Sequence, residues 1–235
     1  MSSEAKNALK ERFQALVQRL REAEHRFGRA PGSVSLVAVS KTYPAEDVRV
    51  ISELGQKDFG ENQVQDALGK IPVLQDCDCV WHFIGPIQSN KCKDVARHFD
   101  WAHSVDRLKI AERLSSLRAG QPAPLNILIQ VNLQNESTKA GIPPDQVPDF
   151  ARVVNAFSNL RLRGLMAIPA PETNFEKQRL VFARLRESLD ETNALLGLRL
   201  DCLSMGMTDD LEAAIAEGAT HVRIGTAIFG PRQKH

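Results

Sequence analysis

The stretch Val37-Ala-Val-Ser-Lys-Thr-Tyr-Pro44 decides how the rest of the chain is interpreted. Together with Leu36 it begins as an unbroken apolar run, which is typical of a strand covered on both faces in a parallel α/β sheet. The run ends at Lys41, where the strand gives way to a loop. A lysine desolvated at a strand end favours the neutral amine, which condenses readily with an aldehyde. The stretch therefore predicts either a Schiff-base lysine at position 41 or a structural lysine paired with a carboxylate.

Strand and helix patterns alternate from this stretch to the end of the chain. Apolar runs bounded by turn residues predict strands at 35–40, 57–60, 80–84, 100–105, 125–131, 160–168, 200–205 and 221–224. Amphipathic patterns predict helices near 45–54, 62–70, 88–97, 106–118, 145–157, 174–196 and 209–217. A further amphipathic helix over 4–27 precedes the first strand. Eight strands without an intervening linker favour one closed (β/α)8 TIM barrel over an open doubly wound sheet.

The domain organisation follows from the same alternation. We expect residues 1–235 to form a single barrel domain, with residues 1–32 as a helical segment packed on it. A length of 235 residues suits such a barrel, which typically has about 250 residues. A core closed at both rims needs no second subunit, so we expect a monomer.

Composition excludes several classes of protein. Thirty basic and twenty-nine acidic residues leave a formal charge of +1, which argues against a nucleic-acid or anionic membrane surface. The basic clusters Arg161-Leu-Arg163 and Arg232-Gln-Lys234 are too short to define such a surface. Four cysteines form neither a disulfide framework nor a zinc ligand set. With no signal peptide pattern and no apolar run near ~20 residues, we expect a cytoplasmic protein without a metal site or membrane span.

Polar residues follow or end several of the predicted strands. In a (β/α)8 barrel all the strands point their carboxyl ends to one face, where the functional site lies. Sequence-distant polar side chains should therefore meet at one mouth, although a single polar residue at a strand end is more often a cap or loop anchor. The candidates are Lys41, Asn62, His82, Lys139, Ser204 and Arg223.

The last two strands end in sequences suited to an anion. Glycines at 206 and 225 allow backbone N–H groups to approach a ligand closely, and Ser204 and Thr226 add hydroxyl donors. The loops after strands seven and eight of such barrels often bind phosphate. We therefore predict a phosphate-bearing ligand, with two ordinary turns as the alternative. No G-x-G-x-x-G or Walker motif follows the first strand.

A lysine facing a phosphate site suggests two chemistries. One is an aldolase that forms a Schiff base with a sugar phosphate, and the other is a protein that holds pyridoxal phosphate (PLP) through Lys41. Arg223 is permanently charged, so near a pyridine nitrogen it would keep that nitrogen unprotonated. Such a ring is a weaker electron sink, which suits α-proton exchange or simple cofactor holding.

Several stretches together resemble one known family, the pyridoxal-phosphate homeostasis proteins, whose fold is similar to the barrel domain of alanine racemase. The stretches are Leu36–Thr42, Phe59–Asn62, Trp81–Gly85 with Gln88 and Asn90-Lys91, Ser137–Gly141, Leu203–Met207 and Val222–Thr226. The resemblance implies that Lys41 carries PLP covalently and that Arg223 faces the pyridine nitrogen. It implies that Ser204, Gly206, Gly225 and Thr226 hold the phosphate. It also places Asn62 and His82 near the ring.

The resemblance further implies a non-catalytic protein in vitamin B6 and amino-acid balance, with apo PLP enzymes as candidate recipients. Alanine racemase needs a tyrosine opposite its lysine, whereas the single tyrosine here, Tyr43, lies two residues after Lys41. We therefore interpret Tyr43 as a wall residue, and a weak racemase and an aldolase remain the alternatives. Tyr43 also stands where the family commonly has lysine, and Gln63 where it often has tyrosine. The retained Lys139 could take over the role of that missing lysine.

Overall fold

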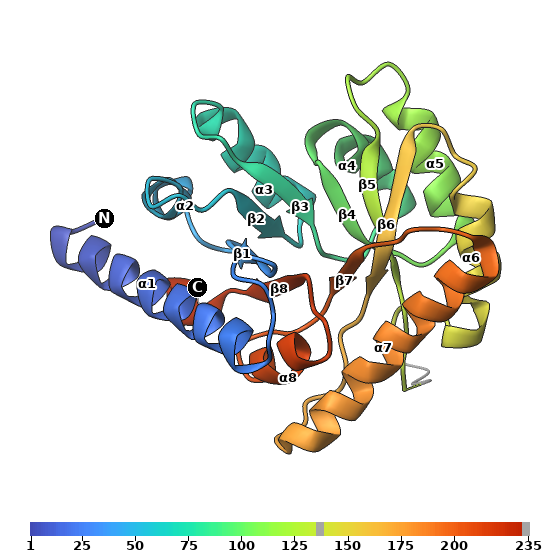
Figure 1. Ribbon diagram of the computed structural model, residues 1–235. Coiled ribbons are helices and arrows are strands. Elements are labelled where there is room, and N and C mark those ends of the chain that lie inside the picture. The colour runs from blue at the N-terminus through green and yellow to red at the C-terminus, as the bar shows by residue number, and fades with distance from the viewer. Residues whose placement is uncertain (135–138, 232–235) are drawn as a thin grey trace.

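Eight parallel strands close into a barrel in which each strand pairs with the next along the chain and β8 pairs with β1 (Figure 1). The computed structural model describes residues 1–134 and 139–231. The strands are β1 Ser35–Val39, β2 Asp58–Glu61, β3 Val80–Phe83, β4 Trp101–Val105, β5 Leu125–Gln130, β6 Leu160–Met166, β7 Cys202–Ser204 and β8 His221–Ile224. The predicted TIM barrel is confirmed. Part of one family stretch, Ser137-Thr138, and the basic cluster 232–234 lie outside the described residues.

Helices connect the strands on the outside of the barrel. They are α2 Ala45–Ser52, α3 Val64–Lys70, α4 Cys92–His98, α5 Leu108–Arg118, α6 Val147–Val154, α7 Phe175–Leu196 and α8 Leu211–Ala216. Each corresponds to a predicted helix. Short 3₁₀ turns η2 Ser89–Lys91 and η3 Pro144–Gln146 form the starts of two of the predicted ones. The sequence did not predict η1 Ile71–Leu74 or α9 Thr226–Phe229, because four residues are too few to show a helical period.

The N-terminal helix α1, Ser3–Arg26, packs along α2, α8 and α9 and lies beside the C-terminal segment (Figure 1). Its first turn is capped by Ser2, whose hydroxyl accepts a hydrogen bond from the Ala5 N–H at 3.2 Å. Arg12 ties the helix to the end of the chain, since its Nε donates to the Ile228 carbonyl at 2.8 Å. The predicted N-terminal helix is therefore present and rests on the barrel's helical layer.

The core has an outer and an inner part. The outer part fills the space between the strands and the helices with aliphatic and aromatic side chains. A smaller cluster of Trp101, Leu128, Met166 and Cys202 forms a separate core. Barrel interiors are usually filled by branched aliphatic side chains, but here buried histidines stand on β3, β4 and β8. One of these histidines, His103, is hydrogen-bonded to Ser204, a residue of the candidate site.

Among the described residues, no helix combines the length and the apolar composition that a bilayer crossing requires.

Candidate functional site

The carboxyl ends of β7, β8 and β1 are neighbours, because these three strands are consecutive around the closed barrel. Val37 on β1 is paired with Arg223 on β8, and Lys41 follows β1 by two residues. Gly225 packs against β1 so closely that a Cβ there would lie 3.1 Å from the Val39 carbonyl oxygen. The structure therefore brings Lys41, the end of β7 and the end of β8 to one rim, as the strand count predicted.

Two residues of α3 fix the backbone on both sides of Lys41. Lys70 Nζ donates to the Ser40 carbonyl oxygen at 2.7 Å. The N–H of Thr42 donates to Asp66 Oδ2 at 2.8 Å. Thr42 has a φ of 68°, in the left-handed region that non-glycine residues adopt only when their surroundings hold them there. The peptide groups that flank Lys41 are therefore held in one conformation.

A buried carboxylate supports this arrangement from β2. Glu61 is fully buried, and its Oε1 accepts from Lys70 Nζ at 2.7 Å and from the Ser40 hydroxyl at 2.6 Å. Burial raises the pKa of Glu61, whereas the neighbouring ammonium of Lys70 lowers it. Its other oxygen, Oε2, is buried and has no hydrogen-bond partner among residues 1–134 and 139–231. We call Ser40, Glu61, Asp66 and Lys70 the ammonium network.

Arg223 presents a buried positive charge at the end of β8. Only 5% of it is exposed, and its guanidinium donates to two neutral acceptors, Ser204 Oγ at 2.7 Å and the Ala167 carbonyl at 2.9 Å. Burial lowers the pKa of Arg223 to about 10, while nearby Asp210 raises it. The guanidinium therefore stays charged at neutral pH. Among the described residues its hydrogen-bond acceptors are neutral, and the nearby negative charge is that of Asp210.

The glycine at the end of β7 is required by its surroundings. Gly206 has a φ of 95°, and a Cβ there would lie 2.6 Å from the Cβ of Ala214 on α8. Its carbonyl accepts from the Arg223 N–H at 3.0 Å, which joins the two strand ends. Thr226 is exposed and begins α9. The predicted phosphate residues thus form one continuous segment of rim, with Ser204 buried and Thr226 open to solvent.

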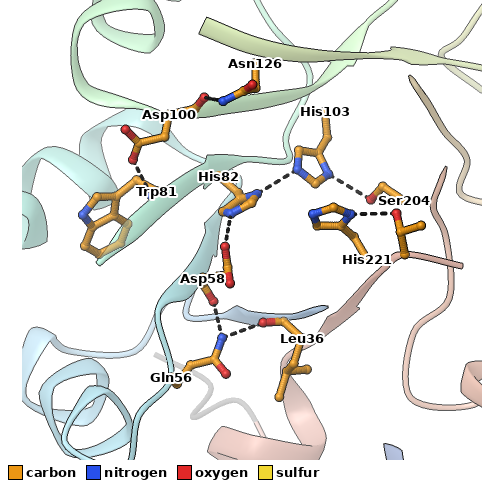
Figure 2. Close-up of polar contacts among 11 residues, drawn as sticks. Leu36, Gln56, Asp58, Trp81, His82, Asp100, His103, Asn126, Ser204 and His221 are labelled. Atoms are coloured by element: carbon orange, nitrogen blue, oxygen red, sulfur yellow. Dashed lines mark hydrogen bonds and ion pairs between the residues drawn. The ribbon is translucent and has the colours of Figure 1, made fainter. Parts of the chain in front are cut away.

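Asn62 and His82 occupy two different environments. Asn62 follows β2 directly and is half-buried, and its backbone is so close to Gly85 that a Cβ there would lie 2.2 Å from the Asn62 carbonyl oxygen. His82 is fully buried inside the barrel, where its ring nitrogens lie 2.9 Å from Asp58 Oδ1 and 2.9 Å from His103 Nε2 (Figure 2). Among these residues His82 connects to the rim through His103 and Ser204. Its predicted closeness to a cofactor ring stays a prediction.

Tyr43 is held by the end of the chain. Its hydroxyl donates to the Gly230 carbonyl at 2.6 Å, and its ring stacks on Phe229 with centroids 4.9 Å apart. Tyr43 therefore packs as a wall between the first βα loop and α9.

Lys139 lies elsewhere, in the segment after β5. It is half-buried, and its carbonyl accepts from Asn132 Nδ2 at 3.3 Å.

A cleft of about 800 Å³ lies on the outer side of this wall, between α1, α2, α3 and α9. Thr42, Tyr43 and Lys70 line it, but the side chains of Ser204 and Arg223 do not. The cleft is therefore a neighbour of the Lys41 loop and is separate from the rim formed by β7 and β8.

Sequence reasoning missed the residues that support the site from behind. The sequence pattern assigns no role to Glu61, Lys70, Asp66, Asp58 or His103. One signal was available, since His103 falls in the middle of a predicted strand, where a polar side chain must find a buried partner. Among the described residues, no three His, Cys, Asp or Glu side chains come together as potential metal ligands.

The fold and this rim define a class, the barrels of the alanine racemase type. A family model described as alanine racemase, N-terminal domain, matches residues 8–233. An alanine racemase of Clostridium difficile 630 has the same fold with a TM-score of 0.69 at 13% identity, over 93% of this chain and 57% of that one.

Closer relatives carry a more specific name. The pyridoxal phosphate homeostasis protein of Pseudomonas aeruginosa is 54% identical over 232 residues, covering 99% of this chain and 97% of that protein. The structure of PipY from Synechococcus elongatus PCC7942 with PLP bound is 37% identical with a TM-score of 0.80, covering 90% of this chain and 100% of that chain. The chain belongs to the alanine racemase N-terminal domain family and, within it, to the pyridoxal phosphate homeostasis proteins. The relative's name describes homeostasis and not a reaction, in agreement with the predicted absence of catalysis.

Proposed function

We propose that this protein binds PLP at the rim formed by β7, β8 and β1, holds it covalently through Lys41, and serves PLP homeostasis without turnover. The relatives' names and the PLP-bound PipY structure support the choice of cofactor. When bound, PLP supplies an aldehyde carbon and a phosphate dianion, and the chemistry of the rim suits both groups.

One observation carries the proposal. Arg223 is a buried cation whose hydrogen-bond partners are neutral, and it lies at the end of the strand paired with the one that leads to Lys41. A buried cation is stabilised by negative charge nearby, so a phosphate dianion at the adjoining Ser204 would add to the effect of Asp210 on Arg223. The residues that would hold PLP are Lys41, Asn62, His82, Ser204, Gly206, Arg223, Gly225 and Thr226. Of these, Arg223 would face the ring nitrogen and Ser204 the phosphate.

The geometry also supports a protein that holds PLP over one that catalyses a reaction with it. A racemase needs acid/base groups on both faces of the substrate carbon. Tyr43 leaves the same strand end as Lys41, and its hydroxyl is bonded to the Gly230 carbonyl. We expect no α-proton exchange when the PLP-loaded protein is incubated with L-alanine in deuterium oxide. Rapid deuterium incorporation, followed by mass spectrometry, would instead establish the racemase alternative.

A spectral titration tests the proposal. We expect wild-type protein to develop the absorbance of lysine-bound PLP, and Lys41→Ala to lack it. Lys93→Ala, which removes an exposed lysine on α4, is the matched control and should titrate like the wild type. An unchanged band in Lys41→Ala would place the covalent link on another residue.

The cellular part of the proposal concerns delivery. We propose a monomeric, cytoplasmic protein that supports vitamin B6 and amino-acid balance by passing PLP to apo enzymes. Its four cysteines are free thiols, in keeping with a reducing compartment. Mixing the loaded protein with an apo PLP enzyme should restore that enzyme's activity faster than the spontaneous release of PLP allows. Equal rates would leave storage as the role.

A further inference from the structure

A chain of hydrogen bonds runs through the inside of the barrel to the proposed phosphate residue. Asp58 Oδ1 lies 2.9 Å from His82 Nε2, and His82 Nδ1 lies 2.9 Å from His103 Nε2. His103 Nδ1 lies 2.9 Å from Ser204 Oγ, which accepts from Arg223 at 2.7 Å. Figure 2 shows the Asp58–Ser204 part of this sequence. We call these five residues the histidine chain.

The hydrogens of the histidine chain have a definite order when both rings are neutral. A carboxylate only accepts, so His82 carries its hydrogen on Nε2 toward Asp58. Its Nδ1 is then an acceptor, so His103 must donate from Nε2. That leaves His103 Nδ1 as an acceptor, and the Ser204 hydroxyl donates to it. In this state Ser204 has no hydrogen to offer a ligand.

One added proton reverses this order. When His82 carries hydrogen on both nitrogens, its Nδ1 donates to His103 Nε2. His103 then carries its single hydrogen on Nδ1 and donates to Ser204 Oγ. Ser204 accepts from both His103 and Arg223, and its own hydrogen turns to the rim. The proton that enters at Ser204 Oγ replaces the hydroxyl hydrogen passed to His103 Nδ1, and the Nε2 hydrogen of His103 passes to His82 Nδ1, so the two states differ in composition by one proton.

We propose that Asp58, His82 and His103 are positioning residues that couple binding of a phosphate-bearing ligand at Ser204 to the uptake of one proton. A phosphate oxygen accepts hydrogen bonds, so the ligand selects the state in which Ser204 donates outward. The proton enters from solvent and is held on His82, with Asp58 as its counter-charge. The inference rests on the proposed function, because it takes Ser204 to be a phosphate contact.

The surroundings favour His82 as the proton's location. In the part of the chain that the structure describes, His82 is the one of the three buried rings that is bonded to a carboxylate, and it stacks on Trp101 with centroids 5.4 Å apart. Burial lowers the pKa of His103 far below its ordinary value and that of His221 to about 4, so both stay neutral near pH 7.

Other charged groups also face these rings. His221 meets Arg163 and Asp201, whose charges oppose each other, and Arg223 repels a charge on His103 and attracts Asp210. Arg163 also stacks over Trp101 at 5.1 Å. These groups act on His103, His221 and Trp101, so they leave Asp58 as the hydrogen-bonded counter-charge of His82.

Calorimetry of PLP binding in buffers of different ionisation enthalpy counts the protons taken up. At pH 8 the phosphate is a dianion, since its second pKa is about 6. Wild-type protein should take up about one more proton than His103→Leu, which can neither donate nor accept, and its affinity should fall about tenfold more per pH unit than that of the variant. His221→Gln is the matched control, because this neighbouring buried histidine bonds to Thr220 and lies outside the chain. It should retain the wild-type proton count.

Nitrogen-15 NMR of the wild type provides a readout that does not depend on the variant's folding. The His103 hydrogen should lie on Nε2 in the free protein and on Nδ1 in the PLP-bound one. Equal proton counts in wild type and a folded His103→Leu, or an unchanged His103 tautomer, would overturn the inference while leaving PLP binding intact. Absence of PLP binding would overturn the proposed function as well.

Discussion

Two buried polar networks lie behind the same rim, and they are built from opposite kinds of chemistry. The ammonium network stands behind Lys41 and contains a fully buried ion pair, Glu61 with Lys70 at 2.7 Å. The histidine chain stands behind Ser204 and links neutral rings whose hydrogens can move from one nitrogen to the other. One network carries fixed charges, and the other carries a movable proton.

The difference shows how one rim can treat the two ends of a ligand differently. It holds the Lys41 backbone in a fixed position and leaves the hydrogen-bond direction of Ser204 adjustable. Fixed charges bind the Ser40 carbonyl and the Thr42 N–H, so they determine where the Lys41 backbone lies. At the Ser204 end, His103 is a neutral ring that can donate to or accept from the hydroxyl, so the donor direction there can follow the ligand. We expect the first network to dominate stability and the second to dominate pH dependence.

Breaking the ammonium network should have the largest effect. Lys70→Met leaves Glu61 buried without its counter-charge, which typically costs about 3–5 kcal/mol in the free energy of unfolding. Urea denaturation followed by circular dichroism measures this change.

The matched control is the double variant Glu61→Gln/Lys70→Met, which removes both charges together. It should recover part of the lost stability, because no unpaired charge remains buried. If the single and double variants were equally unstable, the ion pair would not be the source of the effect.

The next effect concerns pH and His221, a buried histidine that lies beside the histidine chain without belonging to it. The folded-state pKa of His221 is about 4, below the ordinary value of 6.5, because burial disfavours the charged ring. The unfolded state therefore binds more protons, and this stabilising contribution is complete above pH 6.5 and lost as the pH falls toward 4. The loss amounts to about 3 kcal/mol between pH 7 and pH 4.

His221→Gln isolates that contribution, since the variant has no ring to protonate. The difference in unfolding free energy between wild type and variant should shift by about 3 kcal/mol in favour of the variant between pH 7 and pH 4. Urea titrations at intervals across this range measure it. Parallel pH curves for the two proteins would show that His221 is not held neutral.

The smallest effect is expected at Tyr43, in the wall next to the ammonium network. Tyr43→Phe keeps the stacking on Phe229 but removes the bond to the Gly230 carbonyl, which should cost about 0.5–1.5 kcal/mol. Thermal unfolding measures this loss. A loss as large as that of Lys70→Met would mean that the end of the chain, and not the ion pair, holds the Lys41 loop.

The sequence predicted the barrel because its strands are separated by amphipathic helices whose period can be counted. The location of the candidate site could be predicted from the topology, since parallel strands place Lys41, Ser204 and Arg223 at one end of the barrel. The short helix α9 escaped prediction, as did the turn η1, because both are set by tertiary packing and not by a repeating pattern.

The networks behind the rim could not be predicted from the sequence alone. Lys70 ends a helix with ordinary amphipathic spacing, and only the fold shows that its ammonium turns inward to Glu61. The sequence predicts His82 near the ring, but its two bonds, to Asp58 and His103, depend on the register of β2, β3 and β4. Pairing between strands is long-range information that single-strand patterns do not carry.

The most direct test of the central claim is to reduce the PLP-loaded protein with borohydride and to map the modified residue by peptide mass spectrometry. We predict one reduced pyridoxyl phosphate group, attached to Lys41. Modification of a different lysine, or none at all in a protein saturated with PLP, would contradict the account.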